Sequence, residues 1–202
     1  ALIYLKKAAD NGDVYSMKTY GKMMLNSEKV ADKKQSVLYF ELAAKKGDVE
    51  SMFLYALMLE KGEIIPLDLN LAFYYFQEAA SKGNPDAIFH QARMIEKGVI
   101  CEANLNLASK LYKQAADLGS VDAMFWHGKA LYKKDAKVEA SNYFLKAANG
   151  GNVDAMFTYA NMCSSGDGID NDLVDAAKYY KMAADKGHVE SMGLYGMALL
   201  HG

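Results

Sequence analysis

The sequence predicts an all-α protein in which short antiparallel helix pairs stack into a solenoid. The first observation is a motif, Ala-Ala-x-x-Gly, that occurs six times in the 202 residues. Successive glycines of this motif are 35, 36, 36, 32 and 36 positions apart. The second is that the segments between motifs carry apolar residues at i, i+3, i+4 and i+7, the spacing of one α-helical face. A fixed period of this length is typical of repeat architectures.

Each motif is interpreted as the end of one helix, followed at once by the start of the next. A glycine just past the last apolar residue can adopt the left-handed conformation that satisfies the terminal carbonyl groups. The residue after it is in most copies a good N-cap. The glycines are Gly12, Gly47, Gly83, Gly119, Gly151 and Gly187. The residues that follow are Asp13, Asp48, Asn84, Ser120 and Asn152, with His188 a poorer cap in the last copy.

The helix that follows each motif, called helix A, has a narrow apolar stripe. Met52, Tyr55, Ala56 and Leu59 show it in one copy. At the centre of the stripe stands a residue with little or no side chain, which we expect to let the partner helix approach closely. The residues at this position are Gly21, Ala56, Ala92, Gly128, Ala160 and Gly196.

A loop leads from helix A to helix B, which ends at the next motif. The predicted caps of helix B are Asp32, Asp68, Asn104 and Asp172. Its centre carries a pair of large side chains, for example Tyr39-Phe40 and Tyr75-Phe76. Burying one large apolar side chain contributes roughly 1.5–3 kcal/mol, and a single helix pair cannot cover both sides of these residues. Neighbouring pairs must therefore stack on each other, as in other repeat proteins.

The predicted organisation is a single array of twelve helices. It consists of a half repeat (1–12), five repeats (13–47, 48–83, 84–119, 120–151 and 152–187) and a final half repeat (188–202). The repeat at 120–151 is four residues shorter than its neighbours, and Tyr132 to Asp135 replace its loop. The last helix is apolar on all sides, so we expect the natural chain to continue beyond Gly202 or this face to associate end to end with another protein.

The motif, the 36-residue period and the tyrosine that precedes Gly or Ala in helix A resemble the Sel-one-like repeat family, a branch of the tetratricopeptide-like superfamily. The stretch Ser165-Gly166-Asp167-Gly168-Ile169-Asp170 is similar to that family's Gly-rich loop, and residues 96–99 and 61–64 match it in part. The resemblance covers essentially all 202 residues. It implies a right-handed α-solenoid with about 36 residues per repeat. It also implies an adaptor that holds protein complexes together.

Composition narrows the possible partners and location. The net charge is −2 with both signs mixed along the chain, which gives no electrostatic reason to expect nucleic acid as a partner. No apolar run approaches the roughly 18 residues that span a bilayer, so direct membrane insertion is not expected. Cys101 and Cys163 suggest neither a disulfide framework nor a metal site, which favours a cytoplasmic location. The chain does not begin with Met, so the sequence does not decide whether a signal segment precedes Ala1.

The sequence contains no catalytic motif that would indicate an enzyme. Phosphate-binding Gly-rich loops, nucleophile elbows and zinc-protease motifs are all missing from it. His127 occupies a position where other repeats have tyrosine, which favours a packing role. Cys163 fills a core position normally taken by Leu, Met or Ile. We therefore expect no catalytic residue, no metal and no cofactor.

Candidate partner-binding residues lie on helix A beside the apolar stripe. One position is phenylalanine in four repeats: Phe53, Phe89, Phe125 and Phe157. Four residues further along, three repeats have a cation: Lys22, Arg93 and Lys129. Helix A usually lines the concave groove of such arrays, and aromatic residues beside cations suit a peptide or helical segment with acidic character. A competing interpretation is that the phenylalanines only pack one helix A on the next.

Three functions remain to be compared. The leading one is a protein–protein interaction scaffold or adaptor that binds a partner segment in its concave groove. The alternative is a structural spacer in a larger assembly that contacts its neighbours through the convex face, the loops and the ends. An enzyme would need a cluster of acid–base or nucleophilic residues, which the sequence does not show.

Overall fold

The computed structural model describes residues 2–201, except for the side chain of His201, and these residues form helices without a strand. The helices are α1 (Leu2–Asp10), α2 (Val14–Leu25), α3 (Val30–Lys45), α4 (Val49–Lys61), α5 (Leu69–Ser81), α6 (Pro85–Lys97), α7 (Leu105–Asp117), α8 (Val121–Lys133), α9 (Lys137–Asn149), α10 (Val153–Ser165), α11 (Leu173–Asp185) and α12 (Val189–His201). The even-numbered helices are the predicted A helices and the odd-numbered ones the B helices. The all-α prediction is confirmed. Ala1 and Gly202, the predicted ends of the array, lie outside the described residues.

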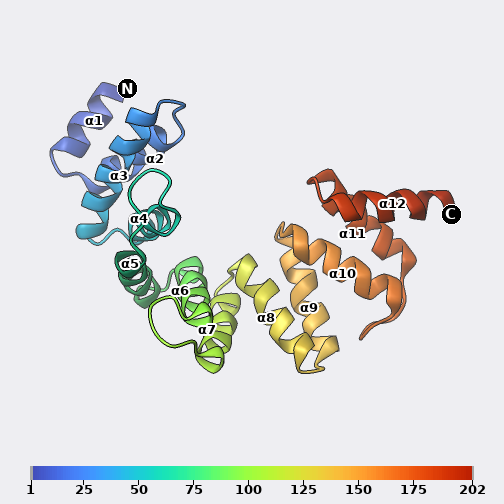
Figure 1. The fold of residues 1–202 in the computed structure, drawn as a ribbon. Helices are drawn as coiled ribbons and strands as arrows, with labels where there is room; N and C mark the ends of the chain where they lie inside the picture. The colour runs from blue at the N-terminus through green and yellow to red at the C-terminus, as the bar shows by residue number, and fades with distance from the viewer. Residues whose placement is uncertain (1, 202) are drawn as a thin grey trace. The chain divides into compact units, whose positions relative to one another are not determined.

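The chain divides into two compact units, Ala1–Ala108 and Ser109–Gly202. In Figure 1 the first unit runs from blue to green and the second from yellow-green to red. Within each unit, helices that follow one another in the chain pack together, from α1 to α6 in the first and from α8 to α12 in the second. Packing between chain neighbours is what stacked helix pairs require. The repeat boundaries given above stay a prediction.

The turn from each helix B to the next helix A has the same geometry in all six copies. The motif glycines have φ between 84° and 101°, in the left-handed region that favours glycine. Each glycine N–H donates to the carbonyl of the second motif alanine, at 2.8–3.0 Å. The N–H of the following residue donates to the carbonyl of the first alanine, at 2.9–3.1 Å. We call this arrangement the corner. It confirms the predicted helix ends.

The N-terminal ends of the A helices are capped as predicted in most copies. Asp13, Asp48, Asn84 and Asn152 each accept a hydrogen bond from the backbone N–H three residues later, at 2.7–2.8 Å. His188 also caps its helix, because its Nδ1 accepts from the N–H of Ser191 at 3.2 Å.

One predicted cap is wrong. Helix α3 begins at Val30 with Lys29 at the N-cap, three residues before Asp32. Asp32 lies in the first turn instead and accepts a hydrogen bond from Ser27 Oγ at 2.6 Å. A carboxylate in the first turn is stabilised by the helix dipole, so the helix gains by starting before Asp32.

Within a pair, helix A and helix B meet through tyrosines and a small residue. Ring pairs with edge-to-face geometry recur at Tyr20–Tyr39, Tyr55–Tyr75 and Tyr159–Tyr179, with centroids 4.9–5.1 Å apart. Such a pair contributes about 0.5–1.5 kcal/mol beyond its buried area. A Cβ on Gly128 would lie 2.8 Å from the ring of Phe144, and one on Gly21 would lie 3.1 Å from Phe40. The close approach predicted from the small residue is therefore confirmed at these two positions.

The short repeat replaces its A-to-B loop by a corner of the same kind. The N–H of Asp135 donates to the carbonyl of Tyr132 at 3.0 Å, and the N–H of Ala136 donates to the carbonyl of Leu131 at 3.1 Å. Asp135 thus occupies the place that glycine has in the other corners. Its φ of 62° makes it the one residue other than glycine with positive φ among the described residues.

We expect Asp135→Gly to stabilise the second unit. A left-handed backbone costs a residue with a Cβ about 1–2 kcal/mol, less for Asp, and the added chain entropy of glycine offsets part of the gain. The expected net gain is about 0.5 kcal/mol, measured as a higher midpoint of urea denaturation. Asp135→Ala is the matched control, which keeps the Cβ and loses the local polar side chain. A midpoint that falls for the glycine variant would contradict the strained geometry.

Candidate functional site

Three of the four phenylalanines of the predicted binding row contact an aromatic ring of helix B in their own repeat. Ring centroids are 6.0 Å apart for Phe53 and Phe76, and 5.8 Å apart for Phe125 and Phe144. Phe157 lies 6.3 Å from Tyr180 in the same way. Phe125 is only 7% exposed, and Phe89, in α6, is 4% exposed. The edges of Phe53 and Phe157 are more open, and both residues are half-buried.

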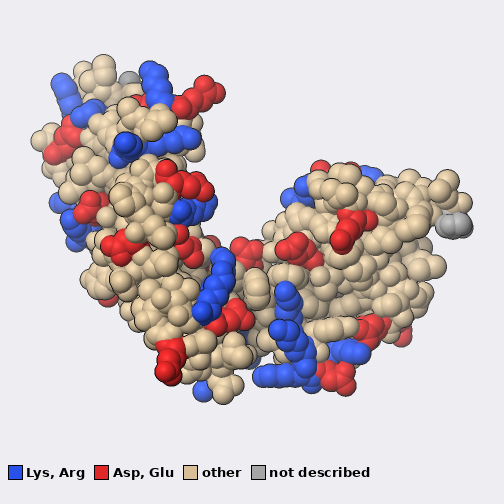
Figure 2. All heavy atoms as spheres, viewed as in Figure 1, with Lys and Arg blue, Asp and Glu red and all other residues tan. Residues whose placement is uncertain are grey.

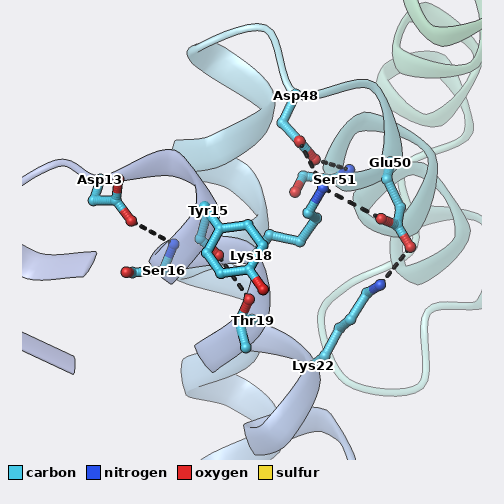
Figure 3. A network of polar contacts seen from close by, with 9 residues as sticks. All are labelled: Asp13, Tyr15, Ser16, Lys18, Thr19, Lys22, Asp48, Glu50 and Ser51. Carbon is cyan, nitrogen blue, oxygen red and sulfur yellow. Dashed lines mark hydrogen bonds and ion pairs between the residues drawn. The ribbon is translucent and has the colours of Figure 1, made fainter. Parts of the chain in front are cut away.

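The same position on helix A also contacts the next helix A. Phe53 lies 5.7 Å from the ring of His90 in α6, and Phe157 lies 4.5 Å from His188 at the start of α12. In α2 this position is Lys18, whose Nζ lies 3.1 Å from Asp48 at the start of α4 (Figure 3). Aromatic contacts and an ion pair thus link successive A helices at one equivalent place. The geometry favours the packing interpretation of the phenylalanine row.

The three cations of the second row differ in their surroundings. Lys22 forms an ion pair with Glu50 of the next helix A, at 2.5 Å (Figure 3). The guanidinium of Arg93 lies 5.7 Å from the ring centre of Phe89. Lys129 lies 4.5 Å from the ring centre of Trp126 and 5.4 Å from that of Phe125. Arg93 and Lys129 are therefore held over aromatic rings, which fixes the direction of long side chains.

The first unit contains two pockets beside the C-terminal halves of its A helices. The first pocket, of about 450 Å³, is lined from α4 by Leu54, Leu57, Met58 and Lys61, together with residues from the α2 end, the α3 start and the loop after α4. The second pocket, of about 430 Å³, is lined from α6 by His90, Arg93, Met94 and Lys97, together with residues from α4, α5 and the loop after α6. Leu57 and Lys61 line both pockets, so the two are adjacent.

The two pockets are the same structural feature in successive repeats. The four residues from α6 lie 36 positions after the four from α4, one for one. Within each helix they have the spacing i, i+3, i+4 and i+7, so they form one face. This face lies beside the core stripe that contains Met52 and Tyr55, and Met58 belongs to both the pocket lining and the buried core. Helix A therefore has one face for the core and another that opens toward solvent.

The second pocket contains a half-buried, hydrogen-bonded pair of side chains, His90 and Glu60. His90 Nδ1 lies 2.9 Å from Glu60 Oε2, and the side chains are 14% and 22% exposed. Burial opposes the charged form of Glu60, but the hydrogen bond from His90 and the nearby charges of Arg93 and Lys97 outweigh it and lower its pKa. His90 also stacks on Phe76, with centroids 4.9 Å apart. His90 and Glu60 are 30 positions apart and lie on different helices, α6 and α4.

The two pockets combine an apolar floor with an excess of positive charge. Their lining includes five cationic side chains, Lys33, Lys34, Lys61, Arg93 and Lys97, and two carboxylates, Glu60 and Glu63. Glu60 is already engaged by His90. Elsewhere, acidic and basic side chains are interspersed over the visible face of both units (Figure 2). The positive excess is thus a property of the pockets and not of the whole chain, whose net charge is −2.

Sequence reasoning found Arg93 but missed the rest of the pocket lining. A signal was present, because Lys61, Lys97 and Lys133 recur eight residues after the phenylalanine position. They were not singled out, since lysine near a helix end is also explained by the helix dipole. The first-pocket residues Leu25 and Val30 come from the preceding repeat, and only the folded chain brings them beside α4.

The described residues contain neither a cluster suited to a metal ion nor a helix suited to span a membrane. Within residues 2–201 no group of three or more His, Cys, Asp and Glu side chains is placed to hold a metal ion. Cys101 is exposed, whereas Cys163 is buried and burial raises the pKa of its thiol. None of the described helices has the length and apolar character needed to cross a bilayer.

Comparison with known families identifies the repeat. The model of the Sel1 repeat matches residues 1–13, 18–48, 49–84, 85–120, 123–152 and 153–188, which together are most of the chain. The chain belongs to the Sel1 repeat family. Repeats of this family generally mediate contacts between proteins, and the fold is typically a scaffold without catalytic function. A search of curated protein sequences found no match.

Several solved structures have a similar fold. A Sel1 repeat protein from Oxalobacter formigenes is 27% identical, with a TM-score of 0.86 over 97% of this chain and 58% of that one. The protective antigen c5321 of uropathogenic Escherichia coli is 23% identical, with a TM-score of 0.85 over 97% of this chain and 43% of that one. The immunity protein Pa5087 of Pseudomonas aeruginosa is 18% identical, with a TM-score of 0.64 over 88% and 67%. The chain spans about half the length of the first two.

His127 shows how a Sel1 repeat tolerates a polar residue in its core. It takes the tyrosine position of α8 and meets Tyr143 edge to face, with centroids 4.7 Å apart. The side chain is buried, and neither ring nitrogen has a hydrogen-bond partner. Burial, followed by the charge of Lys113, lowers the pKa of His127 below its ordinary value. The packing role expected from the sequence is the role that this geometry supports.

We expect His127→Phe to stabilise the protein most strongly at mildly acidic pH. A histidine whose folded-state pKa is lowered binds its proton more readily when unfolded, so stability falls as the pH drops below about 6.5. Phenylalanine keeps the ring contact with Tyr143 and removes two unpaired nitrogens, which together cost about 1–3 kcal/mol. Urea denaturation at pH 7.5 and 5.5 measures the effect. If the stability gain of His127→Phe over the wild type is the same at both pH values, His127 does not change its protonation state on unfolding.

Proposed function

We propose that this Sel1 repeat chain is a protein-binding scaffold that holds a partner segment on the solvent-facing sides of its A helices. The observation that carries the proposal is the pair of equivalent pockets on α4 and α6, since a surface repeated with the period of the array suits an extended ligand. Solenoid repeats present such extended surfaces to proteins in general. The role is non-catalytic.

The predicted binding residues divide into contact and support roles in this proposal. Arg93 and Lys129 are the contact residues, because each carries a charge over a ring on the A-helix face. Lys22 contributes less, because Glu50 already pairs with it. Phe53 and Phe157 support the array, because each contacts the next A helix. Phe89 and Phe125 are buried beneath Arg93 and Lys129 and support these contact residues.

The location proposed for this function is the cytoplasm. Both cysteines are free, Cys101 on the surface and Cys163 in the core, which suits a reducing compartment. The partner class is protein, and the mixed surface charge outside the pockets gives nucleic acid no attractive surface.

Affinity capture from the native cell, followed by mass spectrometry, tests both the scaffold function and the proposed binding surface on the A helices. We expect the wild-type chain to recover a defined partner, and Arg93→Glu with Lys129→Glu to reduce recovery by about tenfold, the loss that follows from roughly 1.4 kcal/mol. The matched control replaces exposed residues of B helices, Leu38→Ala with Tyr74→Ala, which are 50% and 52% exposed. Circular dichroism checks that each variant keeps its helices.

The two sets of variants separate the scaffold from the spacer. Recovery lost with the A-helix variants alone supports the proposed face. Recovery lost with the B-helix variants alone would contradict it and favour a spacer that contacts its neighbours through the convex side.

A further inference from the structure

The two pockets of the first unit differ in chemistry although they occupy equivalent positions. In the first pocket the positions from α4 include Leu54 and Leu57, and in the second pocket the equivalent positions from α6 are His90 and Arg93. The neighbouring repeat extends the difference, because it supplies Leu25 and Val30 to the first pocket. Three cationic side chains line each pocket, but the first has more apolar side chains in its lining and the second has a histidine and an arginine from α6 in place of two leucines.

From this pairing we infer that the first unit recognises a protein segment that carries a bulky apolar side chain next to a carboxylate. The inference rests on the proposed scaffold function and adds the chemistry of the partner. The apolar side chain enters the first pocket, and the carboxylate enters the second. Leu57 and Lys61 line both pockets, so one short segment can occupy the two without leaving the surface.

The second pocket is suited to an anionic group and not to a cation. Arg93 and Lys97 line it from one helix and Lys61 from the other. Its one carboxylate, Glu60, already accepts a hydrogen bond from His90, and its pKa is lowered despite burial. An incoming carboxylate therefore meets three cations and one carboxylate that is already hydrogen-bonded. A guanidinium fixed over a ring presents its donors in a defined direction, as bidentate recognition of a carboxylate requires.

The first pocket is suited to an apolar side chain of medium size. Met58 forms a buried wall, and Leu25, Leu54 and Ile64 are half-buried against the core of the unit. Val30 at the rim is 67% exposed, so the pocket leaves apolar surface in contact with water. Burying such surface under a partner side chain is favourable by about 25 cal/mol per Å². Lys33 and Lys34 at the rim add to the preference for an acidic segment.

Equivalent positions in the second unit differ from helix to helix, and α8 has Trp126, Lys129, Ala130 and Lys133 there. The corresponding residues of α10 are Thr158, Asn161, Met162 and Ser165, none of which is charged. The same helical face thus differs between repeats while the core stripe keeps its apolar character. The positive charge that suits an acidic segment is therefore present on some A helices and absent from others.

The experiment selects ligands for the purified chain from a phage-displayed library of random linear peptides. We expect the selected peptides to share Asp or Glu close to Leu, Ile, Met or Phe. Synthetic copies are then titrated by fluorescence anisotropy against the wild type, Arg93→Glu, Lys97→Glu and Val30→Asp. Lys82→Glu, at an exposed lysine that lines neither pocket, is the control for a change of net charge.

A double-mutant cycle assigns the carboxylate to its pocket. Replacing the peptide's acid by its amide should weaken binding to the wild type by about tenfold or more, and Arg93→Glu should weaken the acidic peptide similarly. The two changes together should add little, because they remove the same interaction. Lys97 is exposed, so Lys97→Glu replaces Arg93→Glu in the cycle if the latter perturbs the fold. It should weaken binding of the acidic peptide in the same way. Val30→Asp should weaken binding without altering the effect of the amide.

Each remaining outcome overturns the inference in a recognisable way. Peptides that bind without an acidic residue, or with equal affinity to all variants, would refute the two-pocket chemistry and leave the scaffold standing. Failure to select any peptide, together with failure to capture a partner, would refute both. Binding to phosphatidylserine vesicles that is lost in Arg93→Glu would show that the basic pocket serves a lipid headgroup instead.

Discussion

The corner after each helix B is the constraint on which the rest of the structure depends. It fixes, in one step, where helix B ends, how sharply the chain reverses and where helix A begins. The glycine is required for its left-handed backbone, and the two alanines supply carbonyls to hydrogen bonds of 2.8–3.1 Å. Nine of the twelve alanines are buried and the other three are half-buried, so the corner is part of the interface between helices. The short repeat forms the same hydrogen bonds between two helices, with aspartate in the glycine position.

Stacking follows from what the corners bring together. Phe40, Phe76 and Phe144 are fully covered, and this coverage comes from their own helix A and from the neighbouring pair. The same helix-A position links successive repeats through an ion pair at Lys18 and through a ring contact at Phe157. Because one face of helix A is committed to this packing, its remaining face is free to vary. In the first unit that face carries the pockets, apolar at Leu57 and basic at Arg93.

Local features of this fold could be predicted from the sequence, and features formed between repeats could not. The corner glycines and most caps depend on a few adjacent residues, so their chemistry is visible in the chain itself. The prediction for Asp32 was wrong because two positions suit a carboxylate at a helix start, and Ser27 selects the second. The pair of His90 with Glu60 joins residues 30 positions apart on different helices, and no local pattern marks it. Arg93 was identified as a candidate because it recurs in register, whereas the apolar walls around it became visible only in the folded chain.

The stability of Gly83→Ala tests the central role of the corner most directly. A Cβ at Gly83 meets nothing within 4 Å, so any effect must come from its left-handed backbone, with φ of 84°. Gly196→Ala is the matched comparison, since that glycine lies within α12 and also has nothing within 4 Å. We expect urea denaturation to show a loss of about 1–2 kcal/mol for Gly83→Ala and a gain of up to about 1 kcal/mol for Gly196→Ala. Equal stability of Gly83→Ala and the wild type would contradict the account, because the corner would then not require glycine.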